Sequence, residues 1–483
     1  MKTERIIPCA LLISAALVSC QKENINTPTE PENLIKKTIT IADTPWTGDA
    51  ETKSFYEEGV GVHLNKLENM SVYYWKHVAN ETEPTANTNI LYTLLDGKNI
   101  TGATANTAGT WTFSHPTIEG AESYNYFFVI PHTSTNALNS KYTGHSFRLA
   151  SVQSPEILNK FKGCESSALS FDPMMDCHIG QAQYGVGIAT EMSDIHFKRV
   201  FTPLKLTITD SQNALEGSPV YTVTLKSNAI ATQNQTLTGI CYFKHSNIFD
   251  EAKISSIEKT SVGNGVSTIY QTPIAKSGDS YTTWFIVNPT KLPAGELTVS
   301  VTTASKTISR TVQNLELVDI KENKINELKF DISGAGYKVE QSDYYYFNLG
   351  EINDLAGVAG SNTGKKPWTH KSCDLLKDVG NSQFNNALRI KKGGTLTYTA
   401  IEGKKLKRIR FYGHPRATTK AVTINVKSGE TSIGKVALNY NDISQNGGYN
   451  DFEVPVDNSQ SNLAFSFEKE AALISAVELF FNE

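Results

Sequence analysis

The sequence lacks the local motifs that mark common enzymes and nucleic-acid-binding proteins. It contains no G-x-S-x-G nucleophile elbow, no H-E-x-x-H zinc pair and no glycine-rich loop suited to phosphate. Acidic residues are numerous, but no pair of them identifies a glycosidase without geometry. The 45 basic and 49 acidic residues leave a net charge of −4, which provides no basic field for nucleic acid. We therefore expect no catalysis, no cofactor and no nucleic-acid partner.

Long apolar runs and helical periodicity are also missing after the first twenty residues. Only residues 156–161 suggest a short helix, with Ser154 as its cap and Pro155 at its first position. Charged residues make up only 19% of the chain, whereas Tyr and Phe number 20 and 21. Short alternating runs separated by polar breaks predict an all-β protein built of sandwiches.

Cysteine is too scarce for a disulfide framework, because the chain has only six. Cys164 and Cys177 are close enough in sequence to pair across a loop, and buried thiols are an equally good interpretation. Neither a C-x-x-C pair nor a histidine spacing typical of zinc is present, so we expect no metal site.

The start of the chain has the layout of an export signal. Lys2 and Arg5 precede an apolar run over residues 6–18, and the run ends in Leu17-Val18-Ser19-Cys20. This ending resembles the lipobox of bacterial lipoproteins, which implies cleavage after residue 19 and acylation of Cys20. Two or more acyl chains hold a protein stably on a membrane. The alternative is an ordinary secreted protein with a chance cysteine at the cleavage site.

The segment after Cys20 points to the cell surface. Gln21-Lys22-Glu23 resembles the surface-export signal of Bacteroidetes lipoproteins. Residues 24–33 are rich in Thr, Pro, Glu and Asn and show no apolar period, so we expect a flexible tether over residues 20–37. The predicted location is the outer face of the outer membrane, with Cys20 as the anchor.

Two motifs in the middle of the chain are informative. Residues 171–176 read F-D-P-M-M-D, and residues 195–208 read I-H-F-K-R-V-F-T-P-L-K-L-T-I. Leu204, Leu206 and Ile208 alternate with polar residues and predict a half-buried strand. Together the motifs resemble the fimbrillin family of Bacteroidetes (Mfa-like and FimA-like proteins). Met175 stands where a tyrosine is usual, and Thr202-Pro203 replaces a small-residue step.

The resemblance implies two tandem transthyretin-like β-sandwich domains, over residues 38–192 and 193–333. It also implies assembly with other fimbrial subunits by strand addition, in which one subunit lends a strand to a groove in the next. In stalk subunits of the family a protease cuts after an arginine to open that groove. Here the region offers only Lys36, Lys37 and Lys53, which favours an accessory, tip or anchor-like subunit.

Residues 337–483 lie outside the fimbrillin pattern. We expect a hinge at residues 333–336 (S-G-A-G), followed by a jelly-roll-like β-sandwich of about eight short strands. Its order of strands resembles galactose-binding-like carbohydrate modules. Sugars are held by aromatic faces and planar polar groups, and the candidates here are Trp368, His370, Arg389, Tyr412, His414 and Arg416. The alternative is that Trp368 folds back over the end of the sandwich and Arg389 pairs with an acid.

The sequence therefore predicts a surface lipoprotein without catalysis, acting as a fimbrial tip or accessory adhesin. Its partners would be other fimbrial subunits, the outer membrane through Cys20, and a host or microbial glycan or protein ligand. The alternative is a surface glycan-binding lipoprotein of a polysaccharide-uptake system.

Overall fold

The structure is a computed structural model. It describes residues 34–41, 55–57, 61–63, 70–77, 91–95, 110–116, 119, 123–130, 137–138, 144–149, 153, 156–157, 169–172, 175–185, 191–195, 197–227, 237–244, 260–262, 274, 276–292, 294–313, 319–321, 325–346, 368–377, 386–400, 403–415, 422–438, 449–459 and 462–482. Cys20, Lys53, Ser154, Pro155, Cys164 and Arg416 lie outside these residues.

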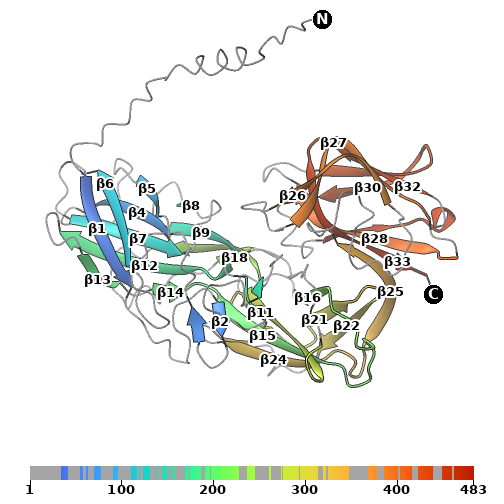
Figure 1. The fold of residues 1–483 in the computed structure, drawn as a ribbon, viewed down its shortest axis with the longest axis horizontal. Helices are drawn as coiled ribbons and strands as arrows, with labels where there is room; N and C mark the ends of the chain where they lie inside the picture. The colour runs from blue at the N-terminus through green and yellow to red at the C-terminus, as the bar shows by residue number, and fades with distance from the viewer. Residues whose placement is uncertain are drawn as a thin grey trace, which may run out of the picture.

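The described elements are strands, apart from one short 3-10 helix, η6 (Val456–Asn458), and this confirms the all-β prediction. No described helix is long and apolar enough to cross a membrane. The short helix expected at residues 156–161 is wrong for its first two residues. Glu156–Ile157 form strand β10, which pairs with β11. The strands fall into three groups along the chain, which Figure 1 shows in blue to green, green to yellow, and orange to red.

The N-terminal group runs from the first strand to Arg199. Its strands are β1 (Leu34–Ile41), β2 (Phe55–Glu57), β3 (Gly61–His63), β4 (Met70–His77), β5 (Leu91–Leu95), β6 (Thr110–Pro116), β7 (Ser123–Ile130), β8 (Ala137–Leu138), β9 (Gly144–Leu149), β10, β11 (Leu169–Ser170), β12 (His178–Gly185), β13 (Glu191–Ile195) and β14 (Phe197–Arg199). The two main sheets have the orders β13-β1-β6 and β14-β12-β7-β4-β5.

Strand pairing places two expected boundaries differently. Residues 34–37, expected in the tether, belong to β1, which lies between β6 and β13, so Lys36 and Lys37 are strand residues. Residue 193, the expected domain boundary, falls inside β13. The chain changes from one sheet to the next between Arg199 and Thr202, because β14 still pairs with β12.

The central group is a sandwich of two sheets. Its strands are β15 (Thr202–Thr209), β16 (Thr222–Ser227), β17 (Gly239–Lys244), β18 (Thr260–Val262), β19 (Ser280–Val287), β20 (Thr290–Lys291), β21 (Leu297–Thr302), β22 (Lys306–Val312), β23 (Asp319–Ile320) and β24 (Asn326–Asp331). The layers β19-β15-β24 and β16-β21-β22 enclose a common hydrophobic core, and β17 instead pairs with β9. Leu204, Leu206 and Ile208 all point into this core, as their alternation predicts.

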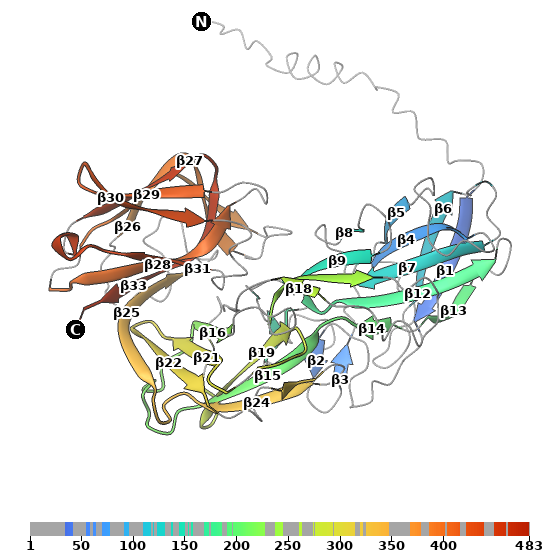
Figure 2. The same cartoon turned by 180° about the vertical axis from the view of Figure 1, so that it is seen from behind.

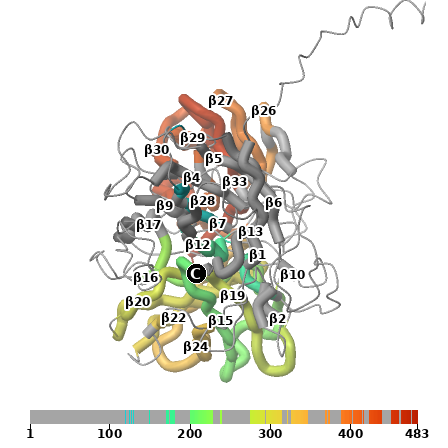
Figure 3. The backbone as a smooth tube through the Cα atoms, turned by 90° about the vertical axis from the view of Figure 1, so that its left-hand side faces the viewer, coloured from blue at the N-terminus to red at the C-terminus, as the bar shows by residue number. Residues whose placement is uncertain are grey.

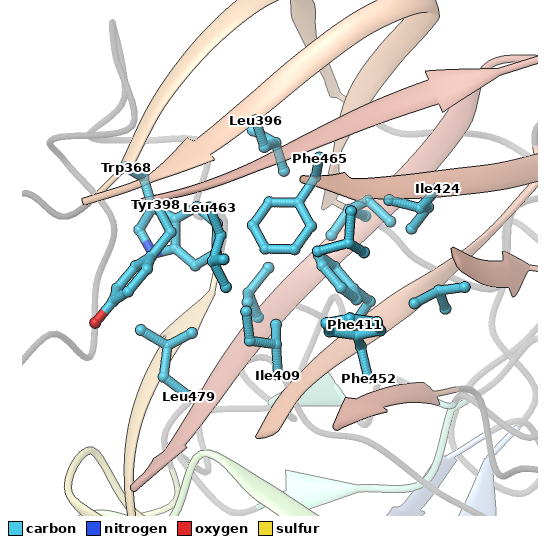
Figure 4. Packing of buried hydrophobic residues seen from close by; sticks show 14 of the residues in the cluster. Trp368, Leu396, Tyr398, Ile409, Phe411, Ile424, Phe452, Leu463, Phe465 and Leu479 are labelled. Atoms are coloured by element: carbon cyan, nitrogen blue, oxygen red, sulfur yellow. The ribbon is translucent and has the colours of Figure 1, made fainter. Parts of the chain in front are cut away.

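The C-terminal group closes into a second sandwich. Its strands are β25 (Lys338–Tyr346), β26 (Trp368–Lys377), β27 (Asn386–Tyr398), β28 (Leu406–Pro415), β29 (Val422–Ser428), β30 (Thr431–Leu438), β31 (Tyr449–Glu453), β32 (Leu463–Glu468) and β33 (Ala472–Phe481). One layer contains β25, β33, β28 and β31, and the other contains β26, β27, β32, β29 and β30. Figure 4 shows the aromatic and branched side chains that fill the space between the layers.

Strand β27 links the two layers of the C-terminal sandwich. Its first half pairs with β33 and its second half pairs with β32. Between the halves residues 391–394 bulge out, and Gly393 takes a φ of +76°, which glycine adopts without strain. This bulge lets one strand pair with both layers of the sandwich.

Strand β25 is shared by the central and C-terminal sandwiches. Its first half pairs with β22, at residues 338–341, and its second half pairs with β33, at residues 342–346. One sheet therefore runs without interruption from β16 to β30. Figures 2 and 3 show the same arrangement from behind and end-on, with β25 beside β33 in Figure 2 and the central strands below the C-terminal ones in Figure 3.

The hinge expected before β25 is contradicted by the contacts of residues 333–336. Ser333 is fully buried, and the Gly334 N–H donates to the Asp331 carbonyl. The Arg310 guanidinium lies against Gly334 and donates to the carbonyl oxygens of Asp331 and Ala335. This segment is a turn, because hydrogen bonds from the Gly334 N–H and to the Gly334 and Ala335 carbonyl oxygens hold its backbone.

Candidate functional site

Trp368, the most suggestive candidate for sugar binding, lies inside the C-terminal sandwich. It begins β26 and only 6% of its surface is exposed. Its ring centroid is 5.6 Å from that of Tyr398 and 6.0 Å from that of Phe465. A large aromatic side chain contributes most when it is buried against other rings, so the indole closes the end of the core (Figure 4). This burial agrees with the alternative given above, in which Trp368 folds back over the end of the sandwich, and not with a tryptophan exposed to a ligand.

Tyr412 is also buried and belongs to β28, not to a turn. Its hydroxyl donates a hydrogen bond of 2.6 Å to Oε2 of Glu478. Burial raises the pKa of Tyr412 well above its ordinary value, and the neighbouring Glu478 carboxylate raises it further. The phenol therefore stays protonated and acts as a permanent donor to Glu478. Because the ring is buried, it offers no face to a ligand.

The other predicted residues do not gather into one site. Arg389 is half-buried in β27, and its cross-strand neighbour in β26 is Asp374, as expected if it pairs with an acid. His370 lies in β26 and His414 in β28, and their side chains are outside the described residues. Trp368 points into the core whereas Tyr412 points out of the opposite layer, so the structure separates the two aromatic candidates.

Cys177 is buried just before β12, and its predicted partner Cys164 is not described, so their pairing stays a prediction. No group of three or more His, Cys, Asp or Glu within the described ranges could hold a metal ion.

The outer side of β25, β28 and β33, which we call the docked face, carries a buried carboxylate that sequence reasoning missed. Glu478 has no exposed surface. It accepts hydrogen bonds from the Thr307 hydroxyl of β22, from the Ser342 hydroxyl of β25 at 2.9 Å, and from Tyr412. Arg410 adds a charge, with Nη1 at 4.0 Å from Oε2. A buried carboxylate needs several donors, and here one comes from the central sandwich.

Backbone and ring contacts complete the docked face. The N–H groups of Ser342 and Tyr344 donate to the carbonyl oxygens of Ser305 and Ala304, in the turn between β21 and β22. The Tyr344 ring lies between two other tyrosines, 5.9 Å from Tyr221 and 5.8 Å from Tyr412. The central sandwich thus covers a face that a free-standing C-terminal sandwich would expose to water.

Ion pairs line the rim of the docked face. Arg408 lies 3.8 Å from the centroid of the Phe480 ring and contacts Glu340 at 3.1 Å. Arg410 binds Asp451 through two hydrogen bonds of 2.7 and 2.9 Å. Arg408 and Arg410 both have acidic partners, so this part of the rim presents little net charge to a ligand.

A second buried carboxylate lies where the chain leaves the N-terminal group. Both oxygens of Asp176 accept from Arg199, at 2.6 and 2.9 Å, and all three side chains of the Asp176, His178 and Arg199 cluster are buried. The Arg199 Nε–H also reaches His178 Nε2 at 3.3 Å. Burial lowers the pKa of His178 to about 4, against the opposing effect of Asp176, so this imidazole is neutral at pH 7.

The Asp176 cluster explains the motif at residues 171–176. Asp176 ends the motif and binds Arg199, which stands inside the second motif. The Phe171 ring contacts the Trp284 ring of β19 at 6.2 Å and lies under Arg199 at 5.9 Å. The two motifs therefore meet in space and connect the N-terminal group to the central sandwich.

Comparison with known proteins gives only weak likenesses. No protein-family model matches the chain, and no curated protein matches it either. A candidate cell adhesion protein of Bacteroides uniformis is 12% identical, with a TM-score of 0.34, over 63% of this chain and 97% of that one. A fimbrial assembly protein of Parabacteroides distasonis is 9% identical, with a TM-score of 0.31, over 64% of this chain and 96% of that one.

A likeness over a smaller share of the chain gives a similar result. CsCBM6-3 of Clostridium stercorarium, solved in complex with cellobiose, is 14% identical with a TM-score of 0.18, over 24% of this chain and 87% of that one. TM-scores this low do not establish a common fold. They assign neither a family nor a function to this chain.

Proposed function

We propose that the chain is a non-catalytic surface lipoprotein of the outer membrane, anchored through Cys20. It acts as an adhesin in a fimbrial tip or accessory position. The lipobox-like Leu17-Val18-Ser19-Cys20 supports the anchor, and the paired motifs at residues 171–176 and 195–208 support the fimbrillin-like assignment. The series of sandwiches matches a protein that carries a binding module away from the membrane.

The observation that carries the tip or accessory role is the shared strand β25. This strand directly follows the central sandwich, and each of its halves is paired within the chain, residues 338–341 with β22 and residues 342–346 with β33. Strand addition requires a segment with free backbone donors and acceptors. Since β25 is built into the sheets of its own chain, it is not free to be lent to a neighbouring subunit, and it holds a binding module instead.

Immunogold electron microscopy of whole cells tests the role. Antibody against the C-terminal sandwich should label filament ends or sparse points along filaments. A smooth label over the cell body would instead favour a glycan-binding lipoprotein of a polysaccharide-uptake system. Dense label along whole filaments would contradict the tip role, because it would mean that the chain polymerises as a stalk.

Mass spectrometry of the native protein tests the anchor. We expect the mature chain to begin at an acylated Cys20, and a Cys20→Ser variant should leave the membrane fraction. An unmodified N-terminal peptide in membrane-bound wild-type protein would refute lipidation.

A further inference from the structure

The side of the C-terminal sandwich opposite the docked face is an ordered polar surface. We call it the open face, and it is the outer side of β26, β27, β32, β29 and β30. Alternate residues of these strands fill the core, among them Leu396, Phe465 and Ile424, so the residues between them point outward. Most of those outward residues are small and polar or basic, and the exposed or half-exposed ones include Thr369, Lys371, Thr395, Thr397, Thr423, Asn425, Lys427, Ser432, Lys435 and Ser466.

Strand register lines these side chains up in rows across the sheet. Lys371 is opposite Thr395, Thr395 is opposite Ser466, Ser466 is opposite Asn425, and Asn425 is opposite Lys435. Neighbouring strands lie about 4.8 Å apart, so this row of five spans about 19 Å with a lysine at each end. A second row runs beside it from Thr369 through Thr397, Ala464 and Lys427 to Ser432.

The charges of the open face are uncompensated, unlike those of the docked face. None of the lysines at positions 371, 427 and 435 has an acidic partner within the described part of the chain. Glu468, opposite Thr423, is the single acid among the described side chains of this face. The basic groups of the docked face, by contrast, are held by Glu340, Asp343 and Asp451.

We propose that the open face binds an anionic polysaccharide that lies across the strands along these rows. The lysine ammonium groups would bind carboxylate or sulfate groups, and the hydroxyl and amide groups would hydrogen-bond to sugar hydroxyls. This proposal names the ligand class for the proposed adhesin and rests on its role as a surface binding protein.

The composition of the open face favours this ligand over other polymers. Protein interfaces are centred on aromatic and large apolar side chains, and the described outward residues of this face include none. Single-stranded nucleic acid needs aromatic stacking platforms and a strongly basic groove, whereas the whole chain carries a net charge of −4. A neutral glycan would give no reason for unpaired lysines at both ends of a row.

The test measures binding of the full chain to immobilised polygalacturonate and to dextran sulfate, with neutral dextran and single-stranded DNA as comparison surfaces. We expect binding to at least one anionic polysaccharide that weakens as salt rises, because salt screens exposed charges. The combined variant Lys371→Gln, Lys427→Gln and Lys435→Gln should weaken binding tenfold or more. These side chains lie on the surface, so the unfolding temperature should not change.

A matched variant separates the face from net charge. Lys276→Gln, Lys329→Gln and Lys405→Gln remove the same charge at exposed positions elsewhere and should change affinity less than twofold. Equal weakening by both variants would overturn the proposal, as would equal or stronger binding to neutral dextran or to DNA. Absence of binding to both anionic surfaces would also overturn it, and would leave the filament labelling that tests the proposed function unaffected.

The hydroxyl groups need their own test. Thr395→Val with Ser466→Ala should weaken binding about threefold without loss of charge. Thr207→Val with Ser300→Ala, at half-exposed positions in the central sandwich, should have no effect. If the Thr395→Val, Ser466→Ala variant keeps wild-type affinity while the lysine variant loses it, the face is a simple charge patch. In that case the proposed row geometry is wrong.

Discussion

The two connections between strand groups use buried carboxylates in different ways. Asp176 lies at the end of the N-terminal group next to the central sandwich, and it is neutralised by Arg199 of the same group through two hydrogen bonds. Glu478, between the central and C-terminal sandwiches, is held mainly by hydroxyl groups from three strands, and its nearest cation is 4.0 Å away. The first is a charge pair and the second is a set of neutral donors around one charge.

The two carboxylates differ in how many neighbouring strands must be in place before their hydrogen bonds are satisfied. An arginine satisfies a carboxylate almost by itself, so the Asp176 pair can form wherever those two side chains meet. Glu478 is satisfied only when β22, β25 and β28 are all in place. The hydroxyl-based site therefore couples the C-terminal sandwich to the central one, and four variants can measure the contrast.

The largest effect is expected for Arg199→Met. It leaves the Asp176 carboxylate buried without its cation, which typically costs about 3–5 kcal/mol. Urea unfolding would measure the loss in the free energy of unfolding. The double variant Asp176→Leu with Arg199→Met removes both charges and should regain most of that loss. If the double variant is as unstable as the single one, packing and not charge holds this connection.

A pH effect should follow from His178. The folded-state pKa of about 4 lies below the ordinary value of 6.5, so the unfolded chain takes up a proton first as pH falls. Stability contributed by the neutral imidazole is full above about pH 6.5 and is lost progressively toward pH 4, by up to about 3 kcal/mol. Unfolding free energies measured between these pH values should show this slope, and His178→Gln should flatten it. An unchanged slope in the variant would assign the effect to other groups.

Thr307→Val should have a smaller effect, at the other connection. It removes one donor to a buried carboxylate without changing the side-chain shape, for a loss of about 2 kcal/mol. Thr311→Val is the matched control, since that hydroxyl also lies on β22 but bonds only to Thr298 within the central sandwich. Chemical denaturation of both variants gives the comparison, and equal losses would contradict a special role for Glu478.

The smallest effect is expected for Lys407→Met at the rim of the docked face. Its ion pair with Glu340 spans 3.5 Å and both side chains are largely exposed. Exposed pairs contribute about 0–1 kcal/mol, so the unfolding free energy should change by less than that. A loss similar to that of Thr307→Val would show that the rim, and not the buried carboxylate, holds the two sandwiches together.

The sequence predicted the strands better than the placement of single side chains. Alternation at Leu204, Leu206 and Ile208 depends only on the pleat of one strand, and these residues are all buried. The exposure of Trp368 and Tyr412 depends on distant partners, Phe465 and Glu478, which no local pattern identifies. For that reason the ligand-binding role expected of Tyr412 does not fit its burial, whereas Trp368 follows the alternative in which it folds back over the end of the sandwich.

Glycine-rich segments are ambiguous in sequence, because glycine is common both in flexible linkers and in tight turns. Residues 333–336 read as a hinge, but in the structure the Arg310 guanidinium packs against the backbone at Gly334. Glu478 was overlooked, although a lone acid within the apolar run at residues 476–481 is itself a signal of a buried polar contact. The donors to Glu478 come from β22, β25 and β28, and no local sequence pattern shows that these strands are neighbours.

Strand β25 also decides how the molecule would carry force. A ligand pulling on the C-terminal sandwich loads this strand along its length, between the ladders with β22 and β33. Hydrogen bonds loaded in shear share the tension and resist it together, whereas a flexible linker would simply extend. A chain built in this way would pass a pull on the C-terminal sandwich to the central one as a stiff rod does.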